Sequence, residues 1–353
     1  MGGLYSAFSS LLFTLDPEKA HNLSLAALKS GFMPTKPAAI DPVLKTNLFG
    51  LEFANPIGLS AGYDKNGDVL DALLGLGFGF VEAGSVTPRP QPGNPKPRIF
   101  RLTEDKGVIN RLGFNNQGLD VAVQNFSAPR RAGIIGANLG ANKDSEDRIA
   151  DYVTGLKALA PLADYVTVNI SSPNTPGLRA LQGRGELEEL LGRVMEARAS
   201  LEHAADQKKP ILLKIAPDLT DEDKEDIAAV AKAVRLDGLI ATNTTITRPD
   251  TLKSDQKTEV GGLSGRPIKA LSLGVVKDMY RLTDGEIPIV GVGGIETAED
   301  AYVRIRAGAS LIQFYSAMVY RGPYLANEIA KGLAKLLKAD GFQSVSQAVG
   351  KDS

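Results

Sequence analysis

Eight short apolar runs, each followed by a longer amphipathic stretch, constrain the fold of this chain more than any other feature. From about residue 54 onward the two kinds of segment alternate, which is typical of a parallel sheet whose strands are joined by crossover helices. The expected strands span residues 55–61, 78–86, 133–139, 164–170, 210–215, 238–243, 287–293 and 311–316. The expected helices include residues 145–159, 186–201, 221–234 and 297–307. Eight strands in this order predict an α/β fold, a single (β/α)8 TIM barrel over residues 36–353.

Capping residues and the absence of nucleotide-binding motifs support this choice. Asp221 and Thr297 are expected to cap two of the helices, because their side chains can accept hydrogen bonds from free backbone N–H groups. A doubly wound sheet is the weaker alternative, since the sequence contains neither G-x-G-x-x-G after a strand nor a G-x-x-x-x-G-K-[ST] loop.

The residue counts exclude several kinds of chemistry. The chain has no cysteine, which excludes disulfides, thiolate nucleophiles and iron–sulfur clusters. Its two histidines, His21 and His203, are too far apart in the sequence to suggest a metal site, so no metal is expected. A formal net charge of −1 gives no reason to expect nucleic acid as a partner. Acid–base chemistry is therefore expected from Ser, Lys, Tyr or carboxylate side chains.

Residues 1–35 differ from the rest of the chain and predict an amphipathic helical hairpin. In the first helix, apolar residues recur at helical spacing at Leu4, Phe8, Leu11, Leu12 and Leu15. Asp16-Pro17 starts the second helix, which ends near Gly31. The first stretch is shorter than the roughly 20 apolar residues that span a bilayer and lacks the features of a secretory signal, so we expect a cytoplasmic protein. The apolar face either packs on the main domain or also contacts a membrane surface or an apolar ligand.

Polar residues stand at the ends of several predicted strands, in otherwise apolar surroundings. They are Asn138, Asn169, Lys214, Thr242 and Asn243. In a (β/α)8 barrel the active site lies at the carboxyl ends of the strands. An unpaired amide or ammonium buried there would cost several kcal/mol, so we expect these groups to face a common polar ligand. Lys214 fits either a Schiff-base nucleophile of a lyase or a fixed cation beside an anionic ligand.

Glycine-rich and asparagine-rich segments indicate the kind of ligand. The segments 261–267 and 291–295 can expose backbone N–H groups, and the latter ends the seventh strand, where such barrels bind phosphate. The segments 110–116 and 169–175 bring Asn110, Asn169 and Asn174 toward Asn243, and carboxamides pair well with an amide or imide ring. Asx turns would explain any one of these loops but not their agreement at one rim.

From about Asp16 to the C-terminus, the order of several motifs resembles that of the dihydroorotate dehydrogenases, specifically the membrane-associated, quinone-reducing class. These motifs are SAGYDKNG, GSVTPRPQPGNPKPR, NRLGFNNQG, GANLGANKD, VNISSPNTPGLR, LLKIAPD, ATNTT, GGLSGRP, GVGGI and QFYSA. The resemblance implies FMN as cofactor, dihydroorotate as substrate, orotate as product and a membrane quinone as electron acceptor, in pyrimidine biosynthesis. The alternatives are a flavin-free lyase that uses Lys214, and a membrane-surface binding module.

The resemblance also implies roles for individual residues. FMN would be bound by Ala61, Gly62, Lys65, Ser85, Asn138, Asn169, Lys214, Thr242, Gly265, Gly294, Tyr315 and Ser316. The substrate would be bound by Lys65, Asn110, Arg111, Leu112, Gly113, Phe114, Asn169, Asn174, Asn243 and Thr244. Lys214 would lie beside the part of the flavin that becomes negative on reduction, which favours its role as a fixed cation. Ser85 stands where relatives commonly have Thr.

The resemblance further implies a base and a quinone site. Ser172 would take the C5 proton, where soluble relatives use Cys, and Thr175 is the candidate for passing the proton onward. The quinone would enter under the hairpin, near His21, Arg101 and Tyr315. His21 could equally be a hydrogen-bonded helix residue, and Arg101 a surface residue.

The start of the chain gives expectations about localisation and lipid contact. It lacks the transit sequence and spanning anchor of mitochondrial members, so we expect a bacterial form that is peripheral to the cytoplasmic side of the cell membrane. Residues 1–33 would contact the lipid surface. The family resemblance predicts a monomer.

Overall fold

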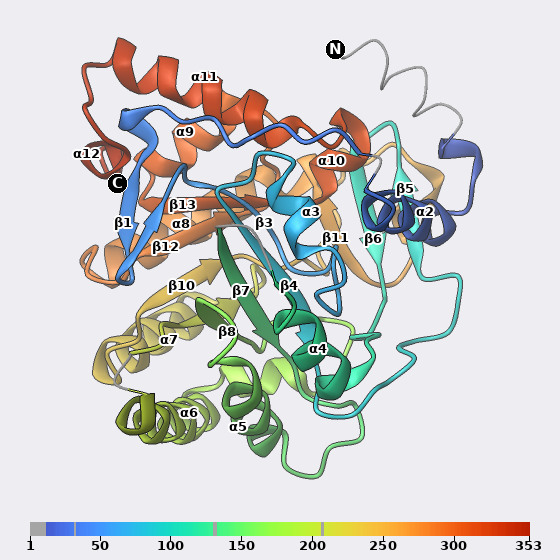
Figure 1. Cartoon of the computed structure of the whole chain (residues 1–353), viewed down its shortest axis with the longest axis vertical. Coiled ribbons are helices and arrows are strands. Elements are labelled where there is room, and N and C mark those ends of the chain that lie inside the picture. Colours follow the sequence, from blue (N-terminus) through green and yellow to red (C-terminus); the bar gives the residue numbers. More distant parts are fainter. Residues whose placement is uncertain (1–11, 32, 130–132, 206–207) are drawn as a thin grey trace.

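The computed structural model describes residues 12–31, 33–129, 133–205 and 208–353, and its centre is a closed barrel of eight parallel strands (Figure 1). In chain order the strands are β3 (Ile57–Leu59), β4 (Phe80–Val86), β7 (Ile134–Leu139), β8 (Tyr165–Asn169), β9 (Ile211–Ile215), β10 (Gly238–Ala241), β12 (Ile289–Val292) and β13 (Ala309–Phe314). Consecutive strands pair, and β13 closes the barrel on β3. All eight predicted strands form the barrel: seven are one to four residues shorter than predicted, and β13 has the predicted length but begins and ends two residues earlier.

The amino end of the barrel is filled and closed by apolar side chains. Phe80, Tyr165, Leu212 and Val290 form a buried cluster there with Phe53. Phe53 belongs to a hairpin of β1 (Thr46–Leu48) and β2 (Leu51–Phe53), and its ring meets that of Phe80 edge to face at 5.3 Å. Because this end is packed, polar groups of the barrel interior can reach a ligand only at the carboxyl ends of the strands.

Helices surround the barrel and bury their apolar faces against its outer side (Figure 1). They are α3 (Leu70–Leu74), α4 (Gly118–Phe126), α5 (Arg148–Leu159), α6 (Arg184–Ala205), α7 (Asp221–Ala233), α8 (Lys269–Leu282), α9 (Ala298–Arg306), α10 (Ser316–Arg321), α11 (Leu325–Ala339) and α12 (Val345–Ala348). Thr297 caps α9 as predicted. The prediction for Asp221 was wrong: Thr220 caps α7 because its extended backbone lets its hydroxyl accept from the N–H of Asp223, and Asp221 lies in the first turn.

Two further elements stand at the carboxyl end of the barrel. Strands β5 (Ile99–Leu102), β6 (Gly107–Asn110) and β11 (Gly262–Gly265) form a small antiparallel sheet that the sequence patterns did not predict. Helix α2 (Pro17–Lys29) contacts β5 (Figure 1) and begins at the predicted cap, Asp16, whose carboxylate accepts from two backbone N–H groups. Of the first predicted helix, residues 12–14 are helical, and Leu4, Phe8 and Leu11 lie outside the described residues.

The length and apolar content of the helices bear on the expected membrane contact. Within the four described ranges, no helix is both long enough and apolar enough to cross a membrane.

Candidate active site

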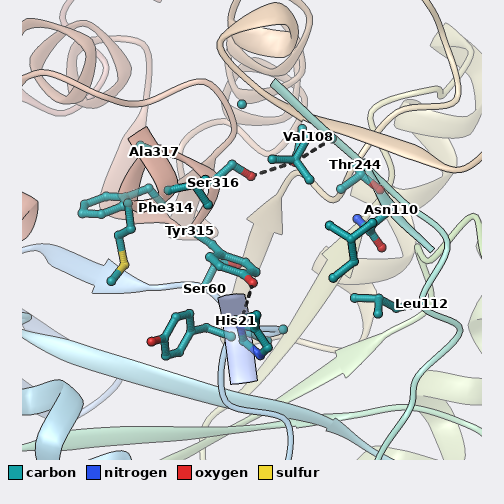
Figure 2. Close-up of a pocket in the computed structure, with 18 of the residues that line it drawn as sticks. His21, Ser60, Val108, Asn110, Leu112, Thr244, Phe314, Tyr315, Ser316 and Ala317 are labelled. Atoms are coloured by element: carbon teal, nitrogen blue, oxygen red, sulfur yellow. Dashed lines mark hydrogen bonds between the residues drawn. The ribbon is translucent and has the colours of Figure 1, made fainter. Parts of the chain in front are cut away.

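A cavity of about 670 Å³ lies at the carboxyl ends of the barrel strands, between the small sheet and α2. Most of the predicted site residues line it. They are Ala61, Gly62, Lys65, Ser85, Asn169, Lys214, Thr242, Gly265, Gly294, Tyr315, Ser316, Asn110, Leu112, Gly113, Phe114, Ser172, Asn174, Asn243, Thr244, His21 and Arg101. Figure 2 shows Asn110, Leu112 and Thr244 on one side of the cavity, and Phe314 and Ala317 on the other.

Lys214 places a buried ammonium group in this cavity. The residue lies on β9 and is 4% exposed. Its Nζ donates to Ser60 Oγ at 3.2 Å, and no ion pair of Lys214 is found among the described residues. Burial lowers the pKa of Lys214 below its ordinary value. An ammonium group with three N–H donors and one protein acceptor is suited to bind acceptor atoms of a ligand.

Lys65 forms a second cationic group, next to His21. Its Nζ donates to the carbonyl of Gly62 at 2.9 Å and lies 3.4 Å from His21 Nε2. Burial lowers the pKa of Lys65 to about 8. Burial, reinforced by the nearby Lys65 ammonium, lowers the pKa of His21 to about 3, so the imidazole is neutral near pH 7. The hydroxyl of Tyr315 lies 3.4 Å from the other ring nitrogen of His21 (Figure 2).

The carboxamides converge as the sequence predicted. Asn243 Nδ2 lies 3.3 Å from Asn169 Oδ1 and 3.0 Å from Ser171 Oγ. Asn174 Nδ2 lies 3.3 Å from Asn110 Oδ1, which joins the loop after β8 to the end of β6. The strands of the small sheet therefore supply part of a rim that the barrel strands alone would leave open.

Ser172 faces the cavity from the loop after β8. It is 7% exposed, and its Oγ accepts from the backbone N–H of Asn174 at 3.3 Å. Ser171 instead donates to Asn169 Oδ1 at 2.8 Å. Thr175 is buried, and its hydroxyl has no hydrogen-bond partner within the described ranges, so it does not hydrogen-bond to Ser172 there.

The two glycine-rich segments meet beside Ser316. Gly265 and Gly294 have φ values of 89° and 70°, which residues with a side chain rarely adopt. A Cβ on Gly294 would lie 2.5 Å from the Cα of Lys269. Ser264 and Ser316 share a hydrogen bond of 2.7 Å between their hydroxyls. These close approaches leave backbone and hydroxyl groups, rather than bulky side chains, facing this part of the cavity.

The part of the cavity below α2 is apolar. It is lined by Leu12, Phe13, Ala20, Leu23, Ala27, Leu28 and Met33 and, across from them, by Val108, Ile268, Phe314, Met318 and Val319. Arg101 stands at this end, donates to the carbonyl of Leu12 at 3.1 Å and lies over the ring of Phe13 at 5.0 Å. Arg101 therefore fixes the segment before α2 on the small sheet.

Two of the residues predicted to bind FMN or the substrate do not line the cavity. The side chain of Arg111 points away from it, pairs with Glu259 at 2.7 Å and covers the ring of Phe100 at 4.5 Å. It does so because its neighbours on β6 alternate in direction, and Asn110 takes the inward position. Asn138 is fully buried behind the lining and hydrogen-bonds to Glu82, Ser85 and Asn169.

Sequence reasoning missed three residues that position the site. Arg179 donates to the carbonyls of Ser171 and Thr244 at 3.1 and 3.0 Å and pairs with Asp218 at 2.8 Å. Burial raises the pKa of Asp218, but hydrogen bonds from Thr245 and Arg179 outweigh burial, so that its pKa lies below the ordinary value. Glu82 is a fully buried carboxylate in the barrel interior. Arg179 and Asp218 end the motifs VNISSPNTPGLR and LLKIAPD but were given no role, and Glu82 lies outside every motif.

Comparisons with known proteins agree with this geometry. A family model described as dihydroorotate dehydrogenase matches residues 43–337. A Rhodospirillum rubrum protein named dihydroorotate dehydrogenase (quinone) is 56% identical over 353 residues, which cover 100% of this chain and 95% of that protein. A protein of the same name from Parvibaculum lavamentivorans is 55% identical over 351 residues, or 99% of either chain. The crystal structure of DHODH in complex with ferulenol from Eimeria tenella matches with a TM-score of 0.91 and 45% identity, covering 96% of both chains.

Proposed function

The chain belongs to the dihydroorotate dehydrogenase family, and from this premise we propose that it oxidises (S)-dihydroorotate to orotate and passes the electrons to a membrane quinone. This reaction belongs to the de novo biosynthesis of pyrimidines. The observation that carries the proposal is a single cavity that has carboxamides and two lysines at one end and an apolar lining under α2 at the other. The first end suits a charged, hydrogen-bonding ring, and the second suits a quinone.

The cavity also suits FMN. Its volume is in the range of cofactor sites, Lys214 offers N–H donors to an anionic ring, and the glycine segments beside Ser316 leave room for a phosphate. We therefore keep as FMN-binding residues Ala61, Gly62, Lys65, Ser85, Asn169, Lys214, Thr242, Gly265, Gly294, Tyr315 and Ser316, with Asn138 supporting Ser85 and Asn169 from behind. When bound, FMN supplies the hydride-accepting and electron-donating chemistry that no side chain can provide.

The residues of the chain bind and orient the substrate. Lys65 pairs with the carboxylate of dihydroorotate, and Asn110, Asn174 and Asn243 offer carboxamides to the ring amides. Asn169, Thr244 and the segment 112–114 complete this pocket, and the Arg111 side chain is left out because it points away. Ser172 takes the proton from C5. Because Thr175 makes no hydrogen bond to Ser172 in the described structure, the hydroxyl proton leaves through water.

The apolar end is proposed as the quinone site. Polar groups near it include the neutral His21, the hydroxyl of Tyr315 and the guanidinium of Arg101, and each can hydrogen-bond to a quinone oxygen. Leu15 and Leu23 are 38% and 51% exposed, which gives this end an apolar outer surface. We infer that residues 1–35 form a unit distinct from the barrel, that residues 1–33 rest on the cytoplasmic side of the cell membrane, and that the protein is a monomer.

Stoichiometry in the steady state tests the proposal. Without oxygen, the purified protein should form one orotate for each quinone reduced, and NAD should not replace the quinone. Turnover of dihydroorotate without any quinone would contradict the proposed acceptor. The lyase alternative predicts instead that borohydride traps a keto substrate covalently on Lys214.

A further inference from the structure

We propose that Glu82, a carboxylate in the barrel interior, is a positioning residue that sets the direction of the hydrogen bonds along the carboxamides of the active site. The inference rests on the proposed function, because the groups whose direction it sets are those that face the flavin and the dihydropyrimidine ring. Glu82 lies two residues after Phe80 on β4 and so faces the barrel axis. It lies one layer below the cavity and does not line it.

Four side chains donate to this carboxylate. Asn138 Nδ2 donates to Oε1 at 2.7 Å. Tyr165, Thr167 and Gln313 donate to Oε2 at 2.9, 3.1 and 3.0 Å. Glu82 has no exposed surface and forms no ion pair with any described residue, so these hydrogen bonds, together with its electrostatic attraction to Lys214, compensate for its buried charge.

The carboxylate determines how the next amide is oriented. An ionised carboxylate can only accept hydrogen bonds, so the NH2 group of Asn138 must face Glu82. Asn138 Oδ1 then faces the other way and accepts from the Ser85 hydroxyl and from Asn169 Nδ2. Because Ser85 uses its proton for Asn138 and accepts from Asn169 at 3.0 Å, it can offer a bound molecule only a lone pair.

The hydrogen bonds keep the same direction along the rim. With its NH2 group turned to Ser85 and Asn138, Asn169 turns Oδ1 toward Ser171 and Asn243. Asn243 therefore donates to Asn169, and its own Oδ1 accepts from the backbone N–H of Thr244 at 2.7 Å. A chain of hydrogen bonds with one direction thus runs from Glu82 to residues that line the cavity.

A neutral amide at position 82 would not preserve this direction. In Glu82→Gln, the remaining oxygen can keep Tyr165, Thr167 and Gln313 as donors, which turns the new NH2 group toward the NH2 group of Asn138. Two donors would then face each other, and relief requires either Asn138 to rotate and each later group to reverse, or the new amide to turn over, which opposes its NH2 group to that of Gln313. The charge of Glu82, rather than its shape, is what specifies the direction.

The test compares Glu82→Gln with the double variant Glu82→Gln/Asn138→Asp. In the double variant the new amide donates to a carboxylate at 138, whose other oxygen again accepts from Ser85 and Asn169. Tyr165→Phe is the matched control, because it removes one donor to Glu82 without reversing any group. The readouts are FMN retained per chain, the dissociation constant of orotate from the flavin spectrum, and the melting temperature of the flavin-free chain.

The account predicts that Glu82→Gln weakens binding of FMN and orotate by about tenfold to a hundredfold, and that the double variant recovers most of this loss. Tyr165→Phe should stay within about threefold of the original affinities. Unchanged binding in Glu82→Gln, an equal loss in Tyr165→Phe, or a double variant no better than the single one would overturn the proposal. If Glu82→Gln fails to fold, a folded double variant that binds both ligands supports the proposal, and a double variant that also fails to fold overturns it.

The flavin-free melting temperature separates this proposal from the proposed function. If the original protein bound no FMN, the proposed function would fail. The direction of the hydrogen bonds would still predict a lower melting temperature for Glu82→Gln and its recovery in the double variant.

Discussion

At the scale of single residues, burial decides which groups of the site carry charge. Lys65 Nζ and His21 Nε2 lie 3.4 Å apart. At pH 7 the imidazole is nevertheless neutral, while the lysine is protonated in most molecules. Lys65 is therefore the cation that can pair with a substrate carboxylate. His21 is left as a neutral hydrogen-bonding group between Lys65 and Tyr315.

The pKa of Lys65 predicts a pH dependence of ligand binding. Its value of about 8 lies well below that of a free lysine, so the ammonium loses its proton as the pH rises through about 8. If Lys65 binds the carboxylate, the dissociation constant of orotate is flat below pH 7 and rises above pH 8, approaching about tenfold per pH unit. Titration of the flavin spectrum with orotate from pH 6 to 9 measures this. Lys65→Met should bind weakly at every pH, and a dissociation constant of the original protein that does not change with pH would rule out this role.

Ser172 is predicted to act in one half-reaction. Ser172→Ala removes the proton acceptor, so reduction of the bound flavin by dihydroorotate should slow by about 10²-fold or more. FMN content and reoxidation by quinone should not change. Ser171→Ala is the control, since Ser171 hydrogen-bonds to Asn169 and does not line the cavity. Equal slowing in both variants would mean that the loop, and not the Ser172 hydroxyl, matters.

At the scale of elements, one ion pair fastens three loops of the barrel. Arg179 joins the loop after β8 to the carbonyl of Thr244, and Asp218 holds both Arg179 and the hydroxyls of Thr245 and Thr247. These loops carry Ser172 and Thr244, two residues of the proposed substrate site. The pair therefore fixes the distance between the proposed base and the opposite wall of the pocket.

Breaking this pair should disturb substrate use more than folding. Asp218→Asn weakens the hold on Arg179, and we expect kcat/KM for dihydroorotate to fall by about tenfold while reoxidation by quinone is spared. Arg184→Ala is the matched control, because Arg184 forms exposed ion pairs with Glu188 and Asp226, and such pairs contribute little. Equal losses in the two half-reactions of Asp218→Asn would assign the pair a general structural role.

Helix α2 is predicted to attach the protein to lipid. Leu15→Asp/Leu23→Asp places charges on the exposed apolar surface at this helix, so binding to vesicles of phosphatidylethanolamine and phosphatidylglycerol should weaken. Flavin reduction by dihydroorotate should not change. Leu271→Asp on α8, at a leucine exposed to 39%, is the control and should bind vesicles like the original protein. Vesicle binding unaffected by the double change would place the lipid contact elsewhere.

At the scale of the whole molecule, the sequence predicted the repeated strand–helix units of the barrel and missed the small sheet, which is not part of the repeat. The eight barrel strands are buried on both faces, so each reads as an apolar run that a helix follows. The strands β5, β6 and β11 are four residues long each, and β11 pairs with β6 across about 150 residues of chain, as in Gly262 with Asn110. No local pattern predicts such a pairing.

In the site, too, residues at strand ends could be predicted, and residues whose role depends on contacts between distant segments could not. Strand ends predicted Asn169, Lys214 and Asn243, because the carboxyl ends of barrel strands meet at one rim. Glu82 could not be found in this way, since its role comes from donors on three other strands, β7, β8 and β13. Arg111 directly follows β6, a strand that the sequence did not predict, so the direction of its side chain could not be predicted either.

The whole molecule joins two chemically different half-sites in one cavity, and single-turnover kinetics test this claim most directly. The purified protein is mixed without oxygen with dihydroorotate and then with a soluble quinone, while the flavin absorbance is followed. The account predicts bleaching with one orotate formed per flavin, followed by full recovery with one quinone reduced. A flavin that dihydroorotate does not bleach, or a folded protein that holds no flavin, would contradict it.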